Sequence, residues 1–187
     1  MEPNKKVSVI VFTRNNPEEL EAFLAMMELQ TYKNHEIIIV DESEGTDISD
    51  KYEGYLDYYK EKFHGDWGQS IKETAGKELA IGEVLCFPNA DAYYTPTFLA
   101  TMMKPHNEGT AEVTYCNYLR HHNNYEFTEA KIELGRTGIV NFLINKELFN
   151  RIGWNDKGPC GDYGLMKDAK NAGARFVKVP GVLCVNN

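Results

Sequence analysis

The chain has 187 residues, 42% of them hydrophobic and 26% charged, which is typical of a folded domain with one full core. Its 28 acidic and 20 basic residues give a formal net charge of -8, and this acidic balance argues against a broad nucleic-acid-binding surface. No apolar run approaches the roughly 20 residues of a membrane-spanning helix, and the first apolar run is too short for a signal peptide.

Two apolar runs with a helix between them predict a parallel unit at the N-terminus. Residues 7–12 form a β-branched run typical of a strand that is covered on both faces. Asn16 is a good N-cap for the next helix, and Pro17 suits its first position. A second buried strand ends at Asp41, so one crossover joins two parallel strands, and we expect it to be right-handed.

The middle of the chain predicts two helices around a third strand. Residues 42–63 are polar and rich in tyrosine, and we expect a short helix there. Residues 64–82 contain a glycine-bearing loop that leads into a helix. The strand at 83–91 ends in Asn89-Ala90-Asp91, and a further helix begins at Thr95.

The remainder of the chain continues the alternation of strands and helices. We expect a strand at 111–119, a polar excursion over 120–138, a short strand and a helix in 139–153, and a last helix with one or two strands in 160–185. This order favours an α/β fold with a mostly parallel central sheet. Three histidines are expected at the surface; they are His106, His121 and His122.

The cysteines show no CxxC spacing, and most lie among apolar or aromatic neighbours. They are Cys86, Cys116, Cys160 and Cys184. We therefore expect free thiols, most of them buried, and a cytoplasmic location, where thiols stay reduced.

Carboxylates end two of the expected strands. Asp41 ends one and Asp91 ends another, and ligands of open α/β sheets bind beyond the carboxyl ends of the strands. Oxygen ligands of this kind suit Mg²⁺ or Mn²⁺ with a substrate phosphate. An ordinary turn explains the pattern Asn89-x-Asp91 equally well, so both interpretations stay open here.

Several motifs then occur in a recognisable order. They are Thr13-Arg14-Asn15, Gln30-Thr31-Tyr32, the strand at 36–40, Asp41 with a polar loop, the glycine loop, residues 80–91, and the late "GDYGLMKDAKNAGARFVKVP". In this order they resemble the family 2 glycosyltransferases, from about Val7 to the C-terminus. The resemblance implies the GT-A fold, a Rossmann-like three-layer α/β/α architecture.

The resemblance also implies a nucleotide-sugar site. The residues it assigns to the nucleotide are Thr13, Asn15, Asp41, Lys72 and Asn89. Asp41 would accept from a uracil or thymine N–H. Asp91 would hold Mn²⁺ or Mg²⁺, which bridges the diphosphate and stabilises it as it leaves.

Asp162 matches the carboxylate that acts as general base in inverting members of the family. An N-cap of the last helix is the alternative role for this residue. Trp154, Gly161 and Tyr93 are candidates for the sugar or acceptor pocket. Trp154 could equally be core, and Tyr93 could equally serve packing.

Two departures from the family pattern concern charge. Asn89 is an amide where the family has a carboxylate, and an amide binds a divalent cation less strongly. Lys72-Glu73-Thr74 replaces the usual Ala-Arg-Asn, so Lys72 would act as a point charge without the arginine fork. Glu73 would be unfavourable beside a diphosphate, and we expect it to point away.

The resemblance therefore predicts one GT-A domain over 1–187, without the C-terminal extension of longer members. Its activity would be metal-dependent transfer of a sugar, with a UDP-sugar as the preferred donor, to a glycan or lipid-linked acceptor with inversion. No nucleic-acid partner is expected, and peripheral membrane contact stays open. The rivals are a degenerate nucleotide-sugar or glycan binder and, ranked lower, a nucleotidyltransferase, which should carry a glycine-rich loop after the first strand.

Overall fold

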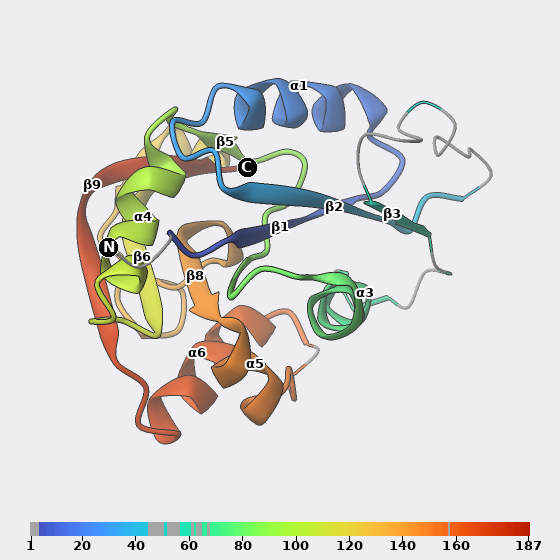
Figure 1. Cartoon of the computed structure of the whole chain (residues 1–187). Helices are drawn as coiled ribbons and strands as arrows, with labels where there is room; N and C mark the ends of the chain where they lie inside the picture. The colour runs from blue at the N-terminus through green and yellow to red at the C-terminus, as the bar shows by residue number, and fades with distance from the viewer. Residues whose placement is uncertain are drawn as a thin grey trace.

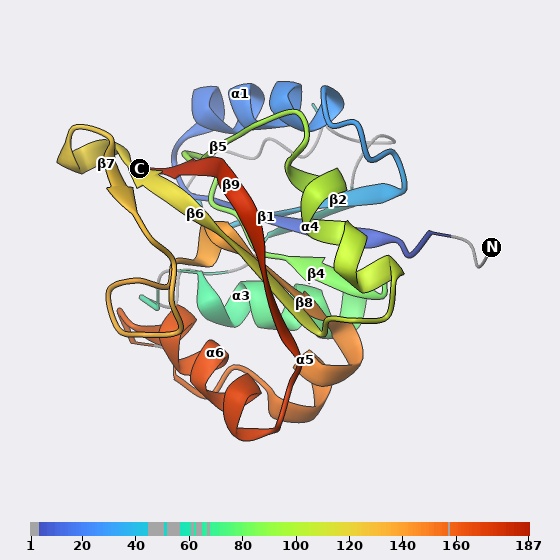
Figure 2. The same ribbon diagram turned by 90° about the vertical axis from the view of Figure 1, so that its left-hand side faces the viewer.

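The computed structural model describes residues 4–44, 51, 57–60, 62, 65–66, 68–156 and 158–187. A single mixed sheet runs through these residues in the order β3-β2-β1-β4-β8-β6-β9-β5, with β7 paired to β6. Helices α1 and α4 cover one face of the sheet, and α3, α5 and α6 cover the other (Figures 1 and 2). The three layers are those of the predicted α/β/α fold.

The N-terminal unit is as predicted. Strand β1 (Val7–Thr13) pairs in parallel with β2 (His35–Asp41), and α1 (Pro17–Glu28) crosses between them. Asn16 is the N-cap residue and Pro17 takes the first helical position. The register places Thr13 beside Asp41, so both lie at the carboxyl edge of the sheet.

The expected short helix in 42–63 is wrong for residues 57–60, although Lys51 is helical. Residues Asp57–Lys60 form strand β3, which pairs in parallel with β2. Two adjacent tyrosines favour a strand, and pairing satisfies the backbone groups on this side of β2. Most of the remaining residues of that segment lie outside the described part of the chain.

Helix α3 (Gln69–Thr74) follows Gly68 and continues into a π-helical turn, η1 (Ala75–Leu79). Strand β4 (Val84–Cys86) pairs in parallel with β1. Beyond β4 the chain stays attached to β1, because Phe12 N–H donates to the Pro88 carbonyl at 3.0 Å and Ala90 N–H donates to the Phe12 carbonyl at 2.9 Å. These bonds hold residues 89–91 against the end of β1.

The C-terminal half extends the sheet with mixed pairing, and β8 lies antiparallel between β4 and β6. Its elements are β5 (Tyr93–Tyr94), α4 (Phe98–Asn107), β6 (Val113–Arg120), η2 (His121–Asn123), β7 (Glu126–Thr128), η3 (Ile139–Asn141), β8 (Phe142–Asn145), α5 (Lys146–Ile152), α6 (Gly161–Asn171) and β9 (Phe176–Asn186). None of the helices in the described part of the chain is long and apolar enough to cross a lipid bilayer.

Helix α4 begins later than the predicted start at Thr95. The backbone of Thr95 is engaged elsewhere, since its N–H donates to the Leu183 carbonyl at 3.0 Å and its carbonyl accepts from the Gln30 amide at 2.8 Å. The helix therefore starts at Phe98, with Thr97 as its N-cap residue.

One surface prediction is wrong. His106 is fully buried on α4, where its Nε2 lies 3.2 Å from Thr114 Oγ1 of β6. His121 and His122 are exposed, as expected. The prediction of free and mostly buried thiols is confirmed, because Cys160 is exposed and the other three cysteines are buried and unpaired.

Candidate active site

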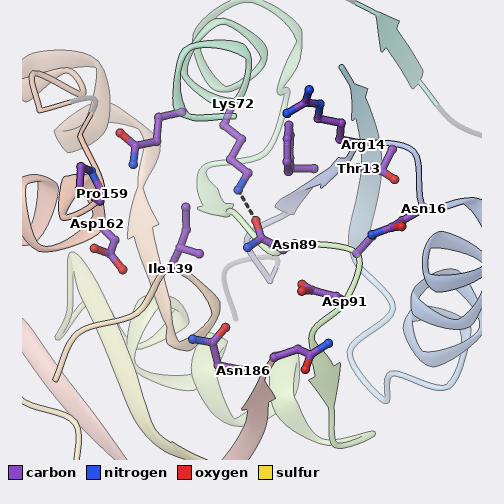
Figure 3. A pocket seen from close by; sticks show the side chains of 14 residues that line it. Thr13, Arg14, Asn16, Lys72, Asn89, Asp91, Ile139, Pro159, Asp162 and Asn186 are labelled. Carbon is purple, nitrogen blue, oxygen red and sulfur yellow. Dashed lines mark hydrogen bonds between the residues drawn. The ribbon is translucent and has the colours of Figure 1, made fainter. Parts of the chain in front are cut away.

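A cavity of about 390 Å³ opens at the carboxyl ends of β1 and β4, beyond the parallel half of the sheet. Its wall includes Thr13, Asn89 and Asp91 from the strand ends, Lys72 from α3 and Asp162 from α6 (Figure 3). Its volume is in the range of pockets that bind small molecules. Half of the predicted site residues therefore meet at one place, although they are far apart in the sequence.

Polar atoms of Thr13 and Asp91 on the wall lack hydrogen-bond partners among the described residues. Thr13 is 3% exposed, and its Oγ1 is buried without a hydrogen bond. Asp91 Oδ1 is also buried without a partner. Burial raises the pKa of the Asp91 carboxyl, while a backbone hydrogen bond and Lys72 lower it. Such orphaned groups are costly in a closed protein interior and indicate a place for a ligand.

Lys72 brings a positive charge to the cavity. The side chain is 1% exposed, its Nζ donates to Asn89 Oδ1 at 2.5 Å, and the ammonium lies 5.0 Å from the centre of the Phe12 ring. Burial lowers the pKa of Lys72 to about 7, and the carboxylates of Asp91 and Asp162 act against this shift. In Figure 3, Lys72 and Asn89 are seen between these two carboxylates.

Asp162 lies in the first turn of α6, and Cys160 is the N-cap residue. The alternative that Asp162 is the N-cap is therefore wrong. Its Oδ1 accepts from the Tyr163 N–H at 2.7 Å. Burial raises the pKa of the Asp162 carboxyl, while backbone hydrogen bonds and Lys72 lower it. A carboxylate in a partly desolvated cavity with a raised pKa is suited to accept a proton near neutral pH.

Asp41 and Asn15 are not among the described residues that line the cavity. Asp41 is fully buried, and its Oδ1 accepts from the Ser43 N–H at 2.8 Å. Asn15 donates its N–H to Ser43 Oγ at 2.7 Å, and its side chain accepts from the Glu44 N–H at 3.2 Å. Asp41 thus contacts the loop that follows it, and its convergence with Asp91 on one ligand stays a prediction.

Trp154 and Gly161 pack against each other away from the cavity. Trp154 is 1% exposed, contacts Phe87 at a ring distance of 5.3 Å, and donates its Nε1–H to the Gly161 carbonyl at 3.0 Å. Stacking of Trp154 on an acceptor sugar is therefore corrected to a core role. A Cβ at Gly161 would lie 2.2 Å from Gln69 Oε1, so this glycine allows α6 to approach α3.

Tyr93 is half exposed and lines a separate hollow of about 140 Å³. This hollow also contacts Asp91, so Tyr93 lies beside the candidate site but outside the main cavity. Glu73 points away as expected, because its carboxylate accepts from the Trp154 N–H at 2.9 Å and from Lys77 Nζ at 2.6 Å.

The sequence interpretation missed Gln69. Gln69 is 6% exposed, lines the cavity, and donates from Nε2 to the Gly158 carbonyl at 3.0 Å, while its Oε1 has no described partner. One signal was available, because Gln69 and Lys72 are three residues apart and so share a helix face. Arg14, Asn186 and Asn187 also line the cavity. No sequence motif pointed to the last two, which the long strand β9 brings to the cavity from the C-terminus.

The wall fits a divalent cation only in part. No group of three or more His, Cys, Asp or Glu side chains that could hold a metal occurs in the ranges described above. Asp91 nevertheless offers a carboxylate oxygen that no described residue bonds, and Mg²⁺ is commonly held by one or two carboxylates together with substrate phosphates. The residues therefore fit a cation shared between Asp91 and a bound diphosphate, rather than a closed protein site.

Comparison with known proteins identifies the family to which the chain belongs. Residues 8–172 match the sequence model of the family described as Glycosyl transferase family 2. The chain belongs to this family, and its α/β/α architecture is the GT-A fold predicted from the sequence.

Two curated relatives match part of the chain. YibD of Escherichia coli (strain K12), an uncharacterized glycosyltransferase, is 26% identical over 120 residues, which cover 63% of this chain and 35% of YibD. EpsH of Bacillus subtilis (strain 168), also named as a glycosyltransferase, is 27% identical over 115 residues, which cover 60% of this chain and 33% of EpsH. The matched region thus spans about a third of the length of each relative.

Solved structures share the fold over nearly the whole chain. TarS of S. aureus (residues 1–349) superposes with a TM-score of 0.73 at 19% identity, covering 97% of this chain and 60% of that one. The mannosyltransferase PcManGT from Pyrobaculum calidifontis, in complex with GDP-Man and Mn²⁺, gives 0.74 at 18% identity, covering 99% and 57%. TarS has also been solved with UDP and with UDP-GlcNAc.

Proposed function

We propose that residues 1–187 form one catalytic domain that transfers a sugar from a nucleotide-sugar donor to an acceptor hydroxyl. The observation that carries the proposal is the cavity at the strand ends, where Lys72 lies near the carboxylates of Asp91 and Asp162. This arrangement provides a cation for a diphosphate and a carboxylate that can accept a proton. Membership of family 2 supports the same reaction class.

The donor diphosphate would bind between Lys72 and Asp91. We assign the nucleoside to the side of the cavity with Thr13, whose Oγ1 has no partner in the described residues. Asp41 and Asn15 act indirectly, because their bonds to Ser43 and Glu44 shape this side of the site. A UDP-sugar is our preferred donor, and the UDP and UDP-GlcNAc complexes of TarS support this choice.

Asp91 would be the protein ligand of a divalent cation, Mn²⁺ or Mg²⁺. When bound, such a cation supplies Lewis-acid stabilisation of the departing diphosphate. The support for this assignment is Asp91 Oδ1, which has no partner among the described residues, and the Mn²⁺ complex of PcManGT.

Asp162 would act as the general base. The acceptor O–H bond breaks and its proton passes to the Asp162 carboxylate, while the acceptor oxygen forms a bond to the anomeric carbon. The bond from that carbon to the phosphate oxygen breaks, and its electron pair leaves with the nucleoside diphosphate. Attack from the face opposite the leaving group inverts the configuration. We propose a glycan or lipid-linked acceptor in the cytoplasm, a reducing location that suits the free thiols.

A degenerate nucleotide-sugar binder is the second candidate. Asn89 favours it, because its amide oxygen is already engaged by Lys72 and adds no negative charge for a metal. A nucleotidyltransferase is less favoured, since the segment after β1 carries one arginine and no glycine.

Calorimetric titration with a panel of nucleoside diphosphates, followed by donor turnover in Mn²⁺, tests the proposal. A transferase should bind UDP and then hydrolyse or transfer at least one nucleotide-sugar. Binding of UDP without turnover of any donor would favour the binder. No binding of any nucleoside diphosphate in Mn²⁺ would contradict both.

A further inference from the structure

Lys72 is a buried charge without a carboxylate partner. Among the described residues its Nζ bonds to the amide oxygen of Asn89, and it takes part in no ion pair there. A buried ammonium is expensive unless it is paired, and an amide oxygen offsets only part of that penalty. In the described part of the chain, the group that touches this ammonium is therefore an amide, and the carboxylates of Asp91 and Asp162 act on it from further away.

The cavity is where this charge can meet a ligand. The side chain is 1% exposed, and the Phe12 ring lies 5.0 Å from the ammonium, so Lys72 does not reach bulk solvent in the way that surface lysines do. Lys72 nevertheless lines the cavity, together with Thr13 and Gln69. Both are also more than nine-tenths buried and carry an oxygen without a hydrogen bond to any residue that the structure describes. Three buried polar side chains thus face one space.

The amide at position 89 leaves the Lys72 ammonium available to an anion, although the carboxylates of Asp91 and Asp162 line the same cavity. A carboxylate at position 89 would form an ion pair with the ammonium and cancel its charge, whereas the amide of Asn89 leaves that charge available. Lysine is a common phosphate ligand because its ammonium is a compact charge with three donors. A diphosphate could share these donors with Asn89 Oδ1.

We propose that Lys72 is the built-in counter-ion of the donor's diphosphate, and that nucleoside diphosphate binding therefore persists when no divalent cation is present. This inference rests on the proposed function, because it requires the diphosphate to enter this cavity. It separates two tasks that a metal often performs together: Lys72 holds the diphosphate, and a cation at Asp91 assists its departure.

The test is calorimetric titration of UDP in EDTA and in Mn²⁺, with GDP as a second probe. For the wild-type chain we expect the Kd in EDTA to be within about tenfold of that in Mn²⁺. Lys72→Met keeps the length of the side chain and removes its charge, and should weaken binding in EDTA by at least about tenfold. Mn²⁺ should restore part of this loss, because Asp91 is unchanged.

Lys77→Met is the matched control. Lys77 lies on the following turn, η1, is partly exposed, and pairs with Glu73 outside the cavity. Removing this charge should leave UDP binding unchanged in both buffers. Thermal unfolding of each variant shows whether the fold is intact.

Asn89→Asp is an independent test in which Lys72 itself is unchanged. The new carboxylate would pair with the ammonium, so UDP binding should weaken in EDTA and depend more strongly on Mn²⁺. If Lys72→Met does not fold, the titrations of Asn89→Asp and of the wild type in EDTA and in Mn²⁺ test the inference.

Two results would overturn the inference and leave the proposed function intact. One is a wild-type chain that binds UDP in Mn²⁺ but not in EDTA. The other is a folded Lys72→Met variant that binds UDP in EDTA as well as the wild type does. Failure to bind either nucleotide in both buffers would instead contradict the proposed function, and this inference with it.

Discussion

At the scale of single residues, the site depends on where polar atoms are left without partners. Thr13 Oγ1, Gln69 Oε1 and Asp91 Oδ1 are buried without a hydrogen bond in the described part of the chain. Native proteins satisfy most buried polar groups, so three such atoms around one cavity indicate that a ligand completes them. This pattern is a property of side-chain environments rather than of residue types.

The role of Asp162 as general base gives a direct prediction. Asp162→Asn keeps the shape of the side chain and removes its ability to accept a proton. Transfer should fall by about 10²-fold or more, while the Kd for UDP changes little. Radiolabelled sugar transfer and calorimetry measure the two effects. Loss of UDP binding together with activity would show that Asp162 holds the donor instead.

His106 predicts a pH dependence of stability. Burial lowers the pKa of His106 to about 4 from its ordinary value of 6.5, and Lys5 contributes to the same shift. The unfolded chain therefore binds a proton between pH 6.5 and pH 4 that the folded chain does not bind. Stability contributed by neutral His106 is complete above pH 6.5 and falls as the pH is lowered toward 4, by about 3 kcal/mol in total.

Urea denaturation of the wild type and of His106→Gln near pH 7 and near pH 4 measures this effect. Carboxylates also titrate in this interval, so the difference between the two proteins isolates the histidine. The variant should lose less stability on acidification than the wild type. Equal losses in both proteins would show that His106 does not titrate with a lowered pKa.

A motif in the sequence could predict which residues lie near the site, but not always where their side chains point. Asp91 and Asp162 belong to motifs with a local pattern, and the structure brings both to the cavity wall. Asp41 belongs to an equally clear motif, yet its carboxylate accepts from the Ser43 N–H and is fully buried. Side-chain direction at a loop depends on the bonds available nearby, and a linear pattern does not contain them.

At the scale of elements, the approach of α6 to α3 determines one side of the site. Gly161 allows this approach, since a Cβ there would lie 2.2 Å from Gln69 Oε1 and 2.4 Å from the Asp156 carbonyl oxygen. Trp154 supports the same contact through its bond to the Gly161 carbonyl. The position of Asp162 therefore depends on the packing of its neighbour in the chain.

Gly161→Ala should consequently harm both stability and function. Relief of the clash requires a shift of backbone at residue 156 or of Gln69, which should lower the free energy of unfolding by about 1–3 kcal/mol. Displacement of Asp162 should also lower kcat for transfer. Gly138→Ala is the control, because a Cβ there meets nothing closer than 3.7 Å. Unchanged unfolding and kinetics for Gly161→Ala would contradict the packing argument.

Elements with strong periodicity could be predicted from the sequence, and those decided by pairing could not. Strand β1 and helix α1 follow from a β-branched run, an N-cap and a proline. The strand at Asp57–Lys60 exists because β2 offers an open edge, and the late start of α4 reflects bonds from Thr95 to β9 and to Gln30. Both depend on partners that are distant in the sequence.

At the scale of the whole molecule, one sheet with helices on both faces brings the two halves of the chain to a common edge (Figure 2). The N-terminal half contributes the strand ends and Lys72, and the C-terminal half contributes Asp162 and the end of β9. The formal net charge is -8, so the field of the whole protein does not attract an anionic donor. Attraction must come from local groups, of which Lys72 is the most deeply buried.

A crystal structure of the chain with UDP and Mn²⁺ tests this account most directly. We expect a diphosphate within hydrogen-bond distance of Lys72 Nζ, Mn²⁺ on Asp91, and the nucleoside beside Thr13. A structure in which UDP occupies another surface, while Lys72 stays on Asn89 and the cavity stays empty at saturating UDP, would contradict it.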